Sequence, residues 1–234
     1  MSAKTSTAPI VWATGDGSEE AALLESVPDS RRLRQILKDL EAIVHQEGFM
    51  HLTMNDIAAR VRCSHVTLYR LAEGRSELFE LLVELYLARA RDSGRQRFSA
   101  ASTWPDRLIG YLSAGAEAAR DTSFAFLRDL QNFPGGRRAL LVHQERRVAD
   151  LETIVTQGVK AGAFNNVNSA VAADILFVSM RRFIEPEFLA KVGLTMGEAM
   201  DEVYKLIEFG IIRTAATDET RAARNRRRAR TKHG

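Results

Sequence analysis

Apolar residues recur at helical spacing along most of the chain, and no stretch alternates apolar and polar residues as a strand does. The first such segment begins after Asp29 or Ser30, either of which can cap a helix. Its apolar positions fall on one stripe: Leu33, Ile36, Leu37, Leu40, Ile43 and Val44. Gly48 is a suitable end for this helix. The pattern predicts an all-α protein.

Two short helices are predicted directly after this first helix. Residues Thr53 to Asp56 fit the S/T-x-x-D/E signature of a helix start, and the apolar pattern breaks at residues 62–64. Ser64 can cap a second short helix over residues 65–71, and a longer helix follows from Ser76. Two short helices joined by a tight turn and braced by a third are typical of a DNA-binding helix-turn-helix, although an ordinary helical hairpin has the same spacing.

The second short helix has an apolar face and a polar face. The positions predicted to pack against the preceding helices are Ser64, Leu68, Leu71 and Ala72. The remaining arc, which offers a methyl contact, hydroxyl groups and a cation to DNA, consists of Val66, Thr67, Tyr69 and Arg70.

Downstream, the helical period continues to residue 216. Helices are predicted over residues 104–120, 122–131, 137–162, 169–183 and 196–216, with a break at residues 133–136 and another at Pro186. The segments 169–183 and 196–216 have more apolar positions than one buried stripe requires. We therefore expect them to form a homodimer interface.

The composition is that of an ordinary globular protein, since 45% of the 234 residues are hydrophobic and 27% are charged. Cys63 is the single cysteine, which excludes an intrachain disulfide, and no Cys/His cluster has the spacing of zinc ligands. No run of about 18 apolar residues predicts a membrane span, and no signal peptide is recognisable. We expect a cytoplasmic protein without a metal, another cofactor or a membrane partner.

The two ends of the chain differ in composition from the middle. Residues 1–28 are rich in small and polar residues without a sustained apolar period, and they are predicted to be a disordered leader. Residues 217–234 carry a net charge of +5, which leaves −2 for the rest of the chain. This basic tail is predicted to be disordered, as an arm for nucleic acid or as a solvated end.

Three segments around the two short helices have a recognisable pattern: Leu52 to Ala58 (L-T-M-N-D-I-A), Ser64 to Arg70 (S-H-V-T-L-Y-R) and Arg75 to Leu78 (R-S-E-L). They are preceded by Gly48-Phe49 and followed much later by Gly158 to Phe164 (G-V-K-A-G-A-F). Over about 50 residues this region resembles the tetracycline-repressor (TetR) family of regulators, whose members typically read T-x-x-D-I-A, S-x-x-T-L-Y-x-H-F and S-K-E-x-L in succession. The chain departs from the family at the turn glycine, which is Arg62, at H-F, which is Leu71-Ala72, and at S-K, which is Gly74-Arg75.

The resemblance implies a three-helix DNA-binding domain over residues 29–75 and a larger helical effector-binding and dimerisation domain over residues 76–216. It implies that Tyr69 and Arg75 contact phosphates of double-stranded DNA, and that Thr53 caps its helix near the DNA backbone. The residues expected to approach base edges are His65, Val66, Thr67 and Arg70. Phosphate contacts would set the register and base contacts the sequence preference.

The resemblance also implies a small hydrophobic or amphipathic effector bound within the larger domain. Candidate residues for that site are Tyr111, Phe124, Phe126, Phe133, His143, Phe177, Met180 and Arg181. Each has an ordinary alternative, because aromatic residues also fill cores and charged residues also lie on surfaces.

The expected function is that of a sequence-specific repressor that binds a palindromic operator as a dimer and is released by an effector. An architectural or accessory DNA-binding protein without an effector is the alternative. Catalysis is not expected, because the sequence has no H-E-x-x-H, G-x-S-x-G or phosphate-binding glycine loop.

Overall fold

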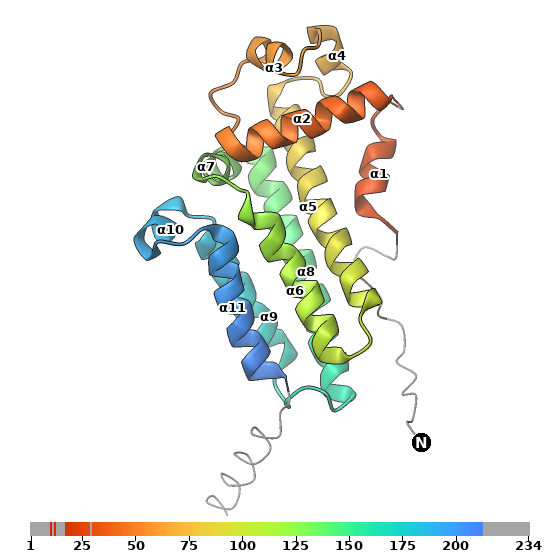
Figure 1. The fold of residues 1–234 in the computed structure, drawn as a ribbon, viewed down its shortest axis with the longest axis vertical. Coiled ribbons are helices and arrows are strands. Elements are labelled where there is room, and N and C mark those ends of the chain that lie inside the picture. The colour runs from red at the N-terminus through yellow and green to blue at the C-terminus, as the bar shows by residue number, and fades with distance from the viewer. Residues whose placement is uncertain (1–9, 11, 13–16, 29, 213–234) are drawn as a thin grey trace, which may run out of the picture.

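The computed structural model describes residues 10, 12, 17–28 and 30–212 (Figure 1). The basic tail from residue 217 lies outside the described residues. Within them the chain is helical: α1 (Glu19–Glu25), α2 (Arg31–Glu47), α3 (Met54–Arg60), α4 (His65–Tyr69), α5 (Arg75–Ala100), α6 (Trp104–Arg120), α7 (Phe124–Asn132), α8 (Pro134–Lys160), α9 (Ser169–Phe183), α10 (Pro186–Val192) and α11 (Met196–Ile211). The all-α prediction is confirmed.

Most of the helices form an elongated bundle, and a small group of short helices lies at one end of it (Figure 1). Helices α3 and α4 form the tip, and α2 lies across the end of the bundle beneath them (Figure 1). Helices α5, α6 and α8 run along the length of the bundle, while α9 and α11 pack on α8 and α6 from the other side. The described part of α11 ends at the opposite end of the molecule from α4 (Figure 1).

Local capping explains where most of these helices begin. Eight of the described helices start after a Ser, Thr or Asn whose side chain accepts a hydrogen bond from a backbone N–H of the first turn, among them the expected caps Ser30, Thr53 and Ser64. Helix α2 ends at Gly48, whose φ of 80° is readily adopted only without a Cβ atom.

The prediction that residues 1–28 are a disordered leader is wrong for the residues that the structure describes. Helix α1 packs along α5, and the carboxylate of Asp92 accepts hydrogen bonds from the Ser18 hydroxyl and from the backbone N–H groups of Glu19 and Glu20. Upstream, Trp12 is buried and its ring stacks on Tyr111. These contacts join residues that are distant in sequence, so local periodicity does not reveal them.

The expected break at residues 133–136 is also corrected by the structure. Pro134 occupies the first turn of α8, where its missing N–H leaves no hydrogen bond unmade. Gly136 lies against Phe79 of α5, and a Cβ atom there would be 2.7 Å from the Phe79 ring. The proline and glycines therefore start the helix close to its neighbour instead of separating two helices.

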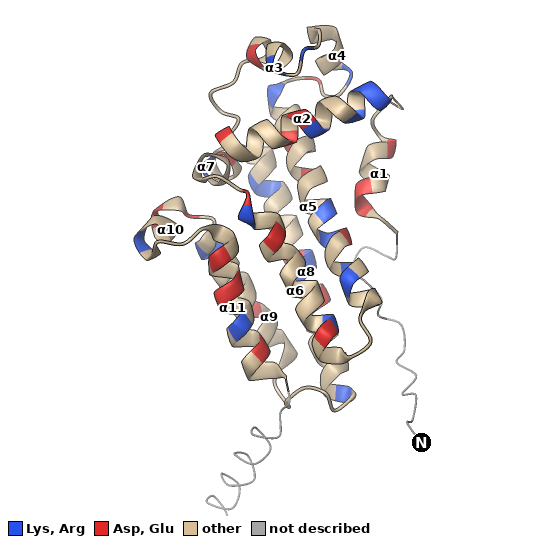
Figure 2. Ribbon diagram, viewed as in Figure 1, with Lys and Arg blue, Asp and Glu red and all other residues tan. Residues whose placement is uncertain are grey.

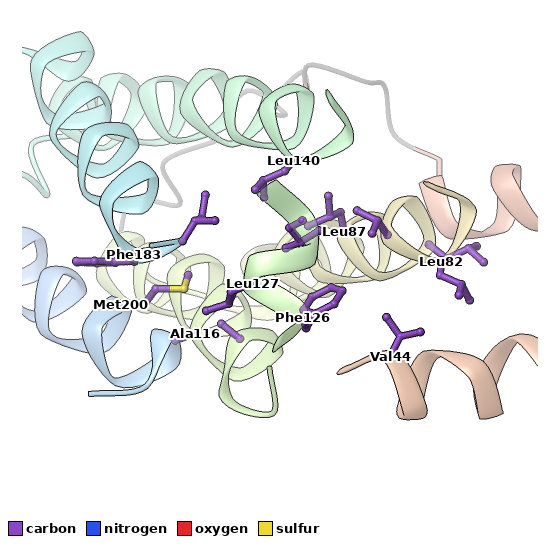
Figure 3. Packing of buried hydrophobic residues seen from close by; sticks show 14 of the residues in the cluster. Val44, Leu82, Leu87, Ala116, Phe126, Leu127, Leu140, Phe183 and Met200 are labelled. Atoms are coloured by element: carbon purple, nitrogen blue, oxygen red, sulfur yellow. The ribbon is translucent and has the colours of Figure 1, made fainter. Parts of the chain in front are cut away.

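One continuous apolar core joins the tip of the molecule to the bundle. Val44 of α2 and Leu82 of α5 lie near each other at one end of this core, and Phe126, Leu127 and Met200 of the bundle lie further along it (Figure 3). None of the described helices is both long and apolar enough to cross a membrane.

Candidate nucleic-acid interface and buried cavity

Helix α3 starts at a reciprocal capping arrangement between Thr53 and Asp56. The backbone N–H of Asp56 donates to the Thr53 hydroxyl at 3.2 Å, and the backbone N–H of Thr53 donates to the Asp56 carboxylate at 2.8 Å. These hydrogen bonds with Thr53 hold the pKa of Asp56 below its ordinary value. The start of α3 is thereby fixed, and both residues are exposed at the tip.

The turn between α3 and α4 keeps a left-handed residue although the glycine typical of the resembled family is absent. Arg62 has a φ of 50°, a conformation that is unusual for a residue with a Cβ atom. The guanidinium of Arg32 on α2 donates to the carbonyl oxygens of Val61 and Arg62 at 3.2 and 2.9 Å. This bond network fastens the turn to α2, while the Arg62 side chain is exposed.

Helix α4 presents one face to solvent and anchors the other. Leu68 is fully buried, whereas the side chain of Val66 is 73% exposed and that of Tyr69 is 54% exposed. Arg70 is exposed at the end of the helix, and His65 is half-buried at its start. A short helix anchored on one side and open on the other has the shape that enters a DNA major groove.

Two of the predicted contact residues are engaged within the protein. The hydroxyl of Thr67 lies 2.9 Å from the hydroxyl of its cap, Ser64. Nη1 of Arg75 donates to the carbonyl oxygens of Met50 and Leu52 at 3.0 Å each, and its guanidinium lies over the Phe133 ring. Arg75 therefore holds the α2–α3 loop against the bundle through Nη1, and the phosphate contact expected of it stays a prediction.

The tip has an excess of basic residues (Figure 2). Residues 30–75 contain eight Lys and Arg against five Asp and Glu. Arg60 is paired with Glu47, but Arg31 and Arg62 are exposed cations that the sequence analysis did not include among the contacts. Their positions on α2 and in the turn become significant only once the helices are folded together.

A buried cavity lies in the bundle between α5, α6, α7, α8, α9 and α11. About 60 Å³ inside it is open to water-sized molecules, which is room for a few waters. Four predicted effector residues line it: Phe126, His143, Phe177 and Met180. The apolar wall also includes Leu87, Leu127, Leu140 and Met200 (Figure 3).

The other four predicted effector residues do not line the cavity. Tyr111 is fully buried, and its hydroxyl donates a hydrogen bond to the Asp150 carboxylate at 3.2 Å. Phe124 is exposed, and Phe133 is buried beneath the α2–α3 loop in an aromatic cluster. The guanidinium of Arg181 lies over an aromatic ring of its own helix. The helical period alone could not separate Tyr111, Phe124 and Arg181 from cavity residues, because each of the three fits the helical pattern.

Three polar side chains of α8 line the cavity, namely His143, Gln144 and Arg147. Nδ1 of His143 lies 2.7 Å from Nη1 of Arg91, and since a guanidinium can only donate, Nδ1 accepts and the ring is neutral. Burial and the nearby arginines hold the pKa of His143 well below its ordinary value. Within the described residues, no group of three or more His, Cys, Asp and Glu is arranged to hold a metal ion.

Helix α7 lies between the cavity and the tip formed by α3 and α4 (Figure 1). Its Phe126 lines the cavity and also contacts the ring of His45 on α2, with 4.7 Å between ring centroids. The Asp129 carboxylate of α7 accepts hydrogen bonds from the backbone N–H groups of Phe49 and Met50. A ligand that entered the cavity and displaced α7 would therefore also displace the end of α2 and the loop that follows it.

The outer faces of α9 and α11 expose large apolar side chains. The exposed residues are Val171, Ile175, Val178, Leu206 and Phe209, of which the last two are 73% and 77% exposed. A shallow, mostly apolar groove runs between the two helices. Soluble monomers rarely expose so continuous an apolar patch, which is more typical of a contact surface.

Comparison with known proteins places the fold. No protein-family model matches the chain. A curated relative, the uncharacterized HTH-type transcriptional regulator YvaF of Bacillus subtilis (strain 168), is 21% identical over 189 residues, which cover 80% of this chain and 99% of that protein.

Solved structures agree over most of the chain. The TetR-family regulator PfmR of Thermus thermophilus has a TM-score of 0.56 and 18% identity, covering 75% of this chain and 98% of that one. Reduced Escherichia coli NemR has a TM-score of 0.64 and 12% identity, with 80% and 100% covered. A Saccharomonospora viridis regulator in complex with choline has a TM-score of 0.60 and 16% identity, with 78% and 98% covered. The chain thus has the fold of TetR-family regulators.

Proposed function

We propose that this protein is a transcription regulator that reads a palindromic DNA operator with α4, as a homodimer, and releases it when a small effector occupies the bundle cavity. The observation that carries the proposal is the exposed face of α4 at the tip of a helix-turn-helix, where Val66, Tyr69 and Arg70 are open to solvent. The proposal assigns no catalytic residue.

The DNA contacts divide by chemistry. Val66 and Arg70 supply a methyl contact and hydrogen-bond donors to base edges, and His65 and Thr67 approach them from the start of α4. Tyr69 and Thr53 contact phosphates, and Arg62 adds a cation beside them. Arg75 supports this surface indirectly, through the loop carbonyls that it holds.

Dimerisation through α9 and α11 is supported by their exposed apolar faces. A two-fold dimer would present two copies of α4 to two half-sites, so that the symmetry of the operator mirrors that of the protein.

Effector control is supported by the cavity and by its connection to the tip through α7. A drug-sized ligand fills a pocket of about 300–1,000 Å³, so an effector must push side chains aside to enter this one. Met180, Met196 and Met200 line it, and methionine side chains rearrange easily. The ligand shifts the equilibrium only by preferring the conformation that does not bind DNA. The Saccharomonospora viridis protein of this fold was solved in complex with choline, which supports small-molecule binding here.

The test is selection of bound duplexes from a random DNA pool by the purified full-length protein. A recovered site with two-fold symmetry, bound far more tightly than competitor DNA at moderate salt, is the expected result. Recovery of unrelated sequences without a common site would overturn operator recognition. It would favour instead the architectural DNA-binding alternative, whose footprint has no preferred sequence.

A further inference from the structure

The cavity contains a buried arginine whose donors are unused. Arg147 of α8 is 7% exposed and lines the cavity. In the part of the chain that the structure describes, neither Nη1 nor Nη2 of this guanidinium has a partner in hydrogen-bonding geometry. Because arginine stays protonated, these are buried charged donors, which cost free energy when nothing accepts from them.

The groups around Arg147 leave its two terminal nitrogens without a hydrogen-bond acceptor among the described residues. Its guanidinium lies over the Tyr111 ring, 4.6 Å from the centroid, which is a favourable contact but not an anion. Asp150 is the carboxylate nearby, and it already accepts from Arg95 at 3.1 Å and from the Tyr111 hydroxyl. No Asp or Glu is among the described residues that line the cavity, and the neighbouring His143 is neutral.

A second polar group lies beside the guanidinium. The buried hydroxyl of Tyr204 on α11 lies beside this guanidinium and favours its charged form, but neither group makes a well-aligned hydrogen bond among the described residues. A Cβ atom on Gly115 would lie 3.0 Å from this hydroxyl oxygen and 3.1 Å from Nη2 of Arg147, so both groups converge where α6 has no side chain. The cavity therefore has a polar corner with hydrogen-bond donors.

The rest of the cavity wall is apolar. Leu176, Phe177 and Met180 come from α9, and Leu127 and Leu130 come from α7. A ligand that fits both regions needs an apolar body and an anionic head with two acceptor oxygens, because the planar fork of arginine binds such a group through parallel hydrogen bonds.

We infer that the effector is an amphiphilic carboxylate, whose head group accepts hydrogen bonds from Arg147 and Tyr204 and whose apolar body lies toward α7 and α9. The inference deepens the proposed function and rests on it in one respect, that filling this cavity releases DNA. Binding of the carboxylate itself does not depend on the DNA step, so the two are measured separately.

The binding test uses the full-length protein without DNA and three carboxylates, hexanoate, octanoate and decanoate, each paired with the alcohol of the same chain length. Thermal unfolding and titration calorimetry measure binding. We expect at least one carboxylate to bind about tenfold or more tightly than its alcohol, the preference that a charge-assisted hydrogen bond gives. Equal binding of acids and alcohols, or no binding of the acids, would overturn the inference.

The residue test uses Arg147→Met, which keeps an apolar chain of similar length, and Tyr204→Phe, which removes one hydroxyl. Arg147→Met is expected to abolish the preference for the acid, because it weakens acid binding far more than alcohol binding, and Tyr204→Phe is expected to reduce the preference several-fold. The matched control is Arg146→Met, which removes a cation of the same helix that is paired with Glu19 outside the cavity. If Arg147→Met and Tyr204→Phe, both folded, keep the full preference, the head group lies elsewhere and the inference is wrong.

Release of the selected operator by the bound carboxylate is then measured. Arg147-dependent binding without release would contradict effector control and leave the carboxylate site intact. Release by the neutral alcohols alone would contradict the carboxylate site and leave effector control intact.

Discussion

Single residues at the tip combine structural roles with proposed roles in DNA recognition, and Arg62 shows the conflict between them. Its φ of 50° suits glycine better than arginine, yet its side chain places a cation beside α4. Arg32 holds the Arg62 carbonyl oxygen, so the turn geometry does not depend on the Arg62 side chain. The strained conformation is thus compatible with a contribution of the side chain to DNA binding.

Arg62→Gly is expected to raise the free energy of unfolding by up to about 1 kcal/mol, because glycine adopts this φ without the clash of a Cβ atom. The same variant is expected to lower DNA affinity and to reduce the slope of log K against log salt by about 0.9, the loss of one phosphate contact. Urea unfolding and binding over a salt series measure the two effects. A variant that is less stable, or that keeps the wild-type slope, would contradict this account of Arg62.

The exposed residues of α4 are expected to differ in how they affect DNA binding. Tyr69→Ala is expected to weaken binding to all sequences alike, as loss of a phosphate contact does. Val66→Ala and Arg70→Ala are expected to change sequence preference, with a loss of discrimination of about 1–3 kcal/mol for a good base contact. Binding to the selected operator and to single-base variants measures this. Lys191→Ala on α10 removes the same charge as Arg70→Ala and is expected to leave preference unchanged.

At the scale of elements, the sequence predicts what local chemistry determines. The helices at 104–120 and 169–183 were predicted with their observed bounds, because Thr103-Trp104-Pro105 and Asn168-Ser169 start them by capping. Helix α1 was missed because Asp92, on another helix, holds its start. For the same reason, the loop contact of Arg75 and the cavity position of Arg147 could not be predicted, since both depend on which helices become neighbours.

The contact between α2 and α7 predicts a dependence of stability on pH. His45 of α2 packs against the rings of Tyr86 and Phe126, and burial lowers its pKa to about 4. The unfolded chain binds a proton here below about pH 6.5, while the folded chain does not until about pH 4. Stability is therefore fully present above about pH 6.5 and falls as the pH drops toward 4, by on the order of 3 kcal/mol for this group.

His45→Phe keeps an aromatic ring in this contact and removes the titrating group. Urea unfolding between pH 4 and pH 7 is expected to show a shallower loss of stability for the variant than for the wild type. Some loss remains, because the lowered pKa of His143 acts with the same sign. Parallel pH profiles of the two proteins would show that His45 does not titrate as a buried neutral group.

At the scale of the whole molecule, the cavity and the tip lie in one continuous core, so they are mechanically connected. Phe126 faces the cavity and touches α2, and Asp129 holds the α2–α3 loop. The apolar face of α9 and α11, which is the proposed dimer interface, belongs to helices that border the same cavity from the other side, through Phe177, Met180 and Met200. A ligand that moves these helices would change the spacing of the two α4 helices in a dimer. Binding to a palindromic operator depends on that spacing, because its two half-sites lie a fixed distance apart.

The dimer face gives the last prediction. Phe209→Glu on α11 and Val178→Glu on α9 replace exposed apolar side chains, so the fold of the single chain has little reason to change. In a dimer each would place a carboxylate in an apolar interface, at a large desolvation cost. Sedimentation at micromolar concentration is expected to show a dimer for the wild type and the 26.1 kDa chain for the variants. The variants are also expected to bind the operator more weakly, because each half-site is then bound separately.

Phe124→Glu, which changes an exposed phenylalanine on α7, is the control and is expected to remain dimeric. A wild-type protein that sediments only at 26.1 kDa, or dimeric variants, would show that the apolar faces of α9 and α11 do not hold two copies of the chain together.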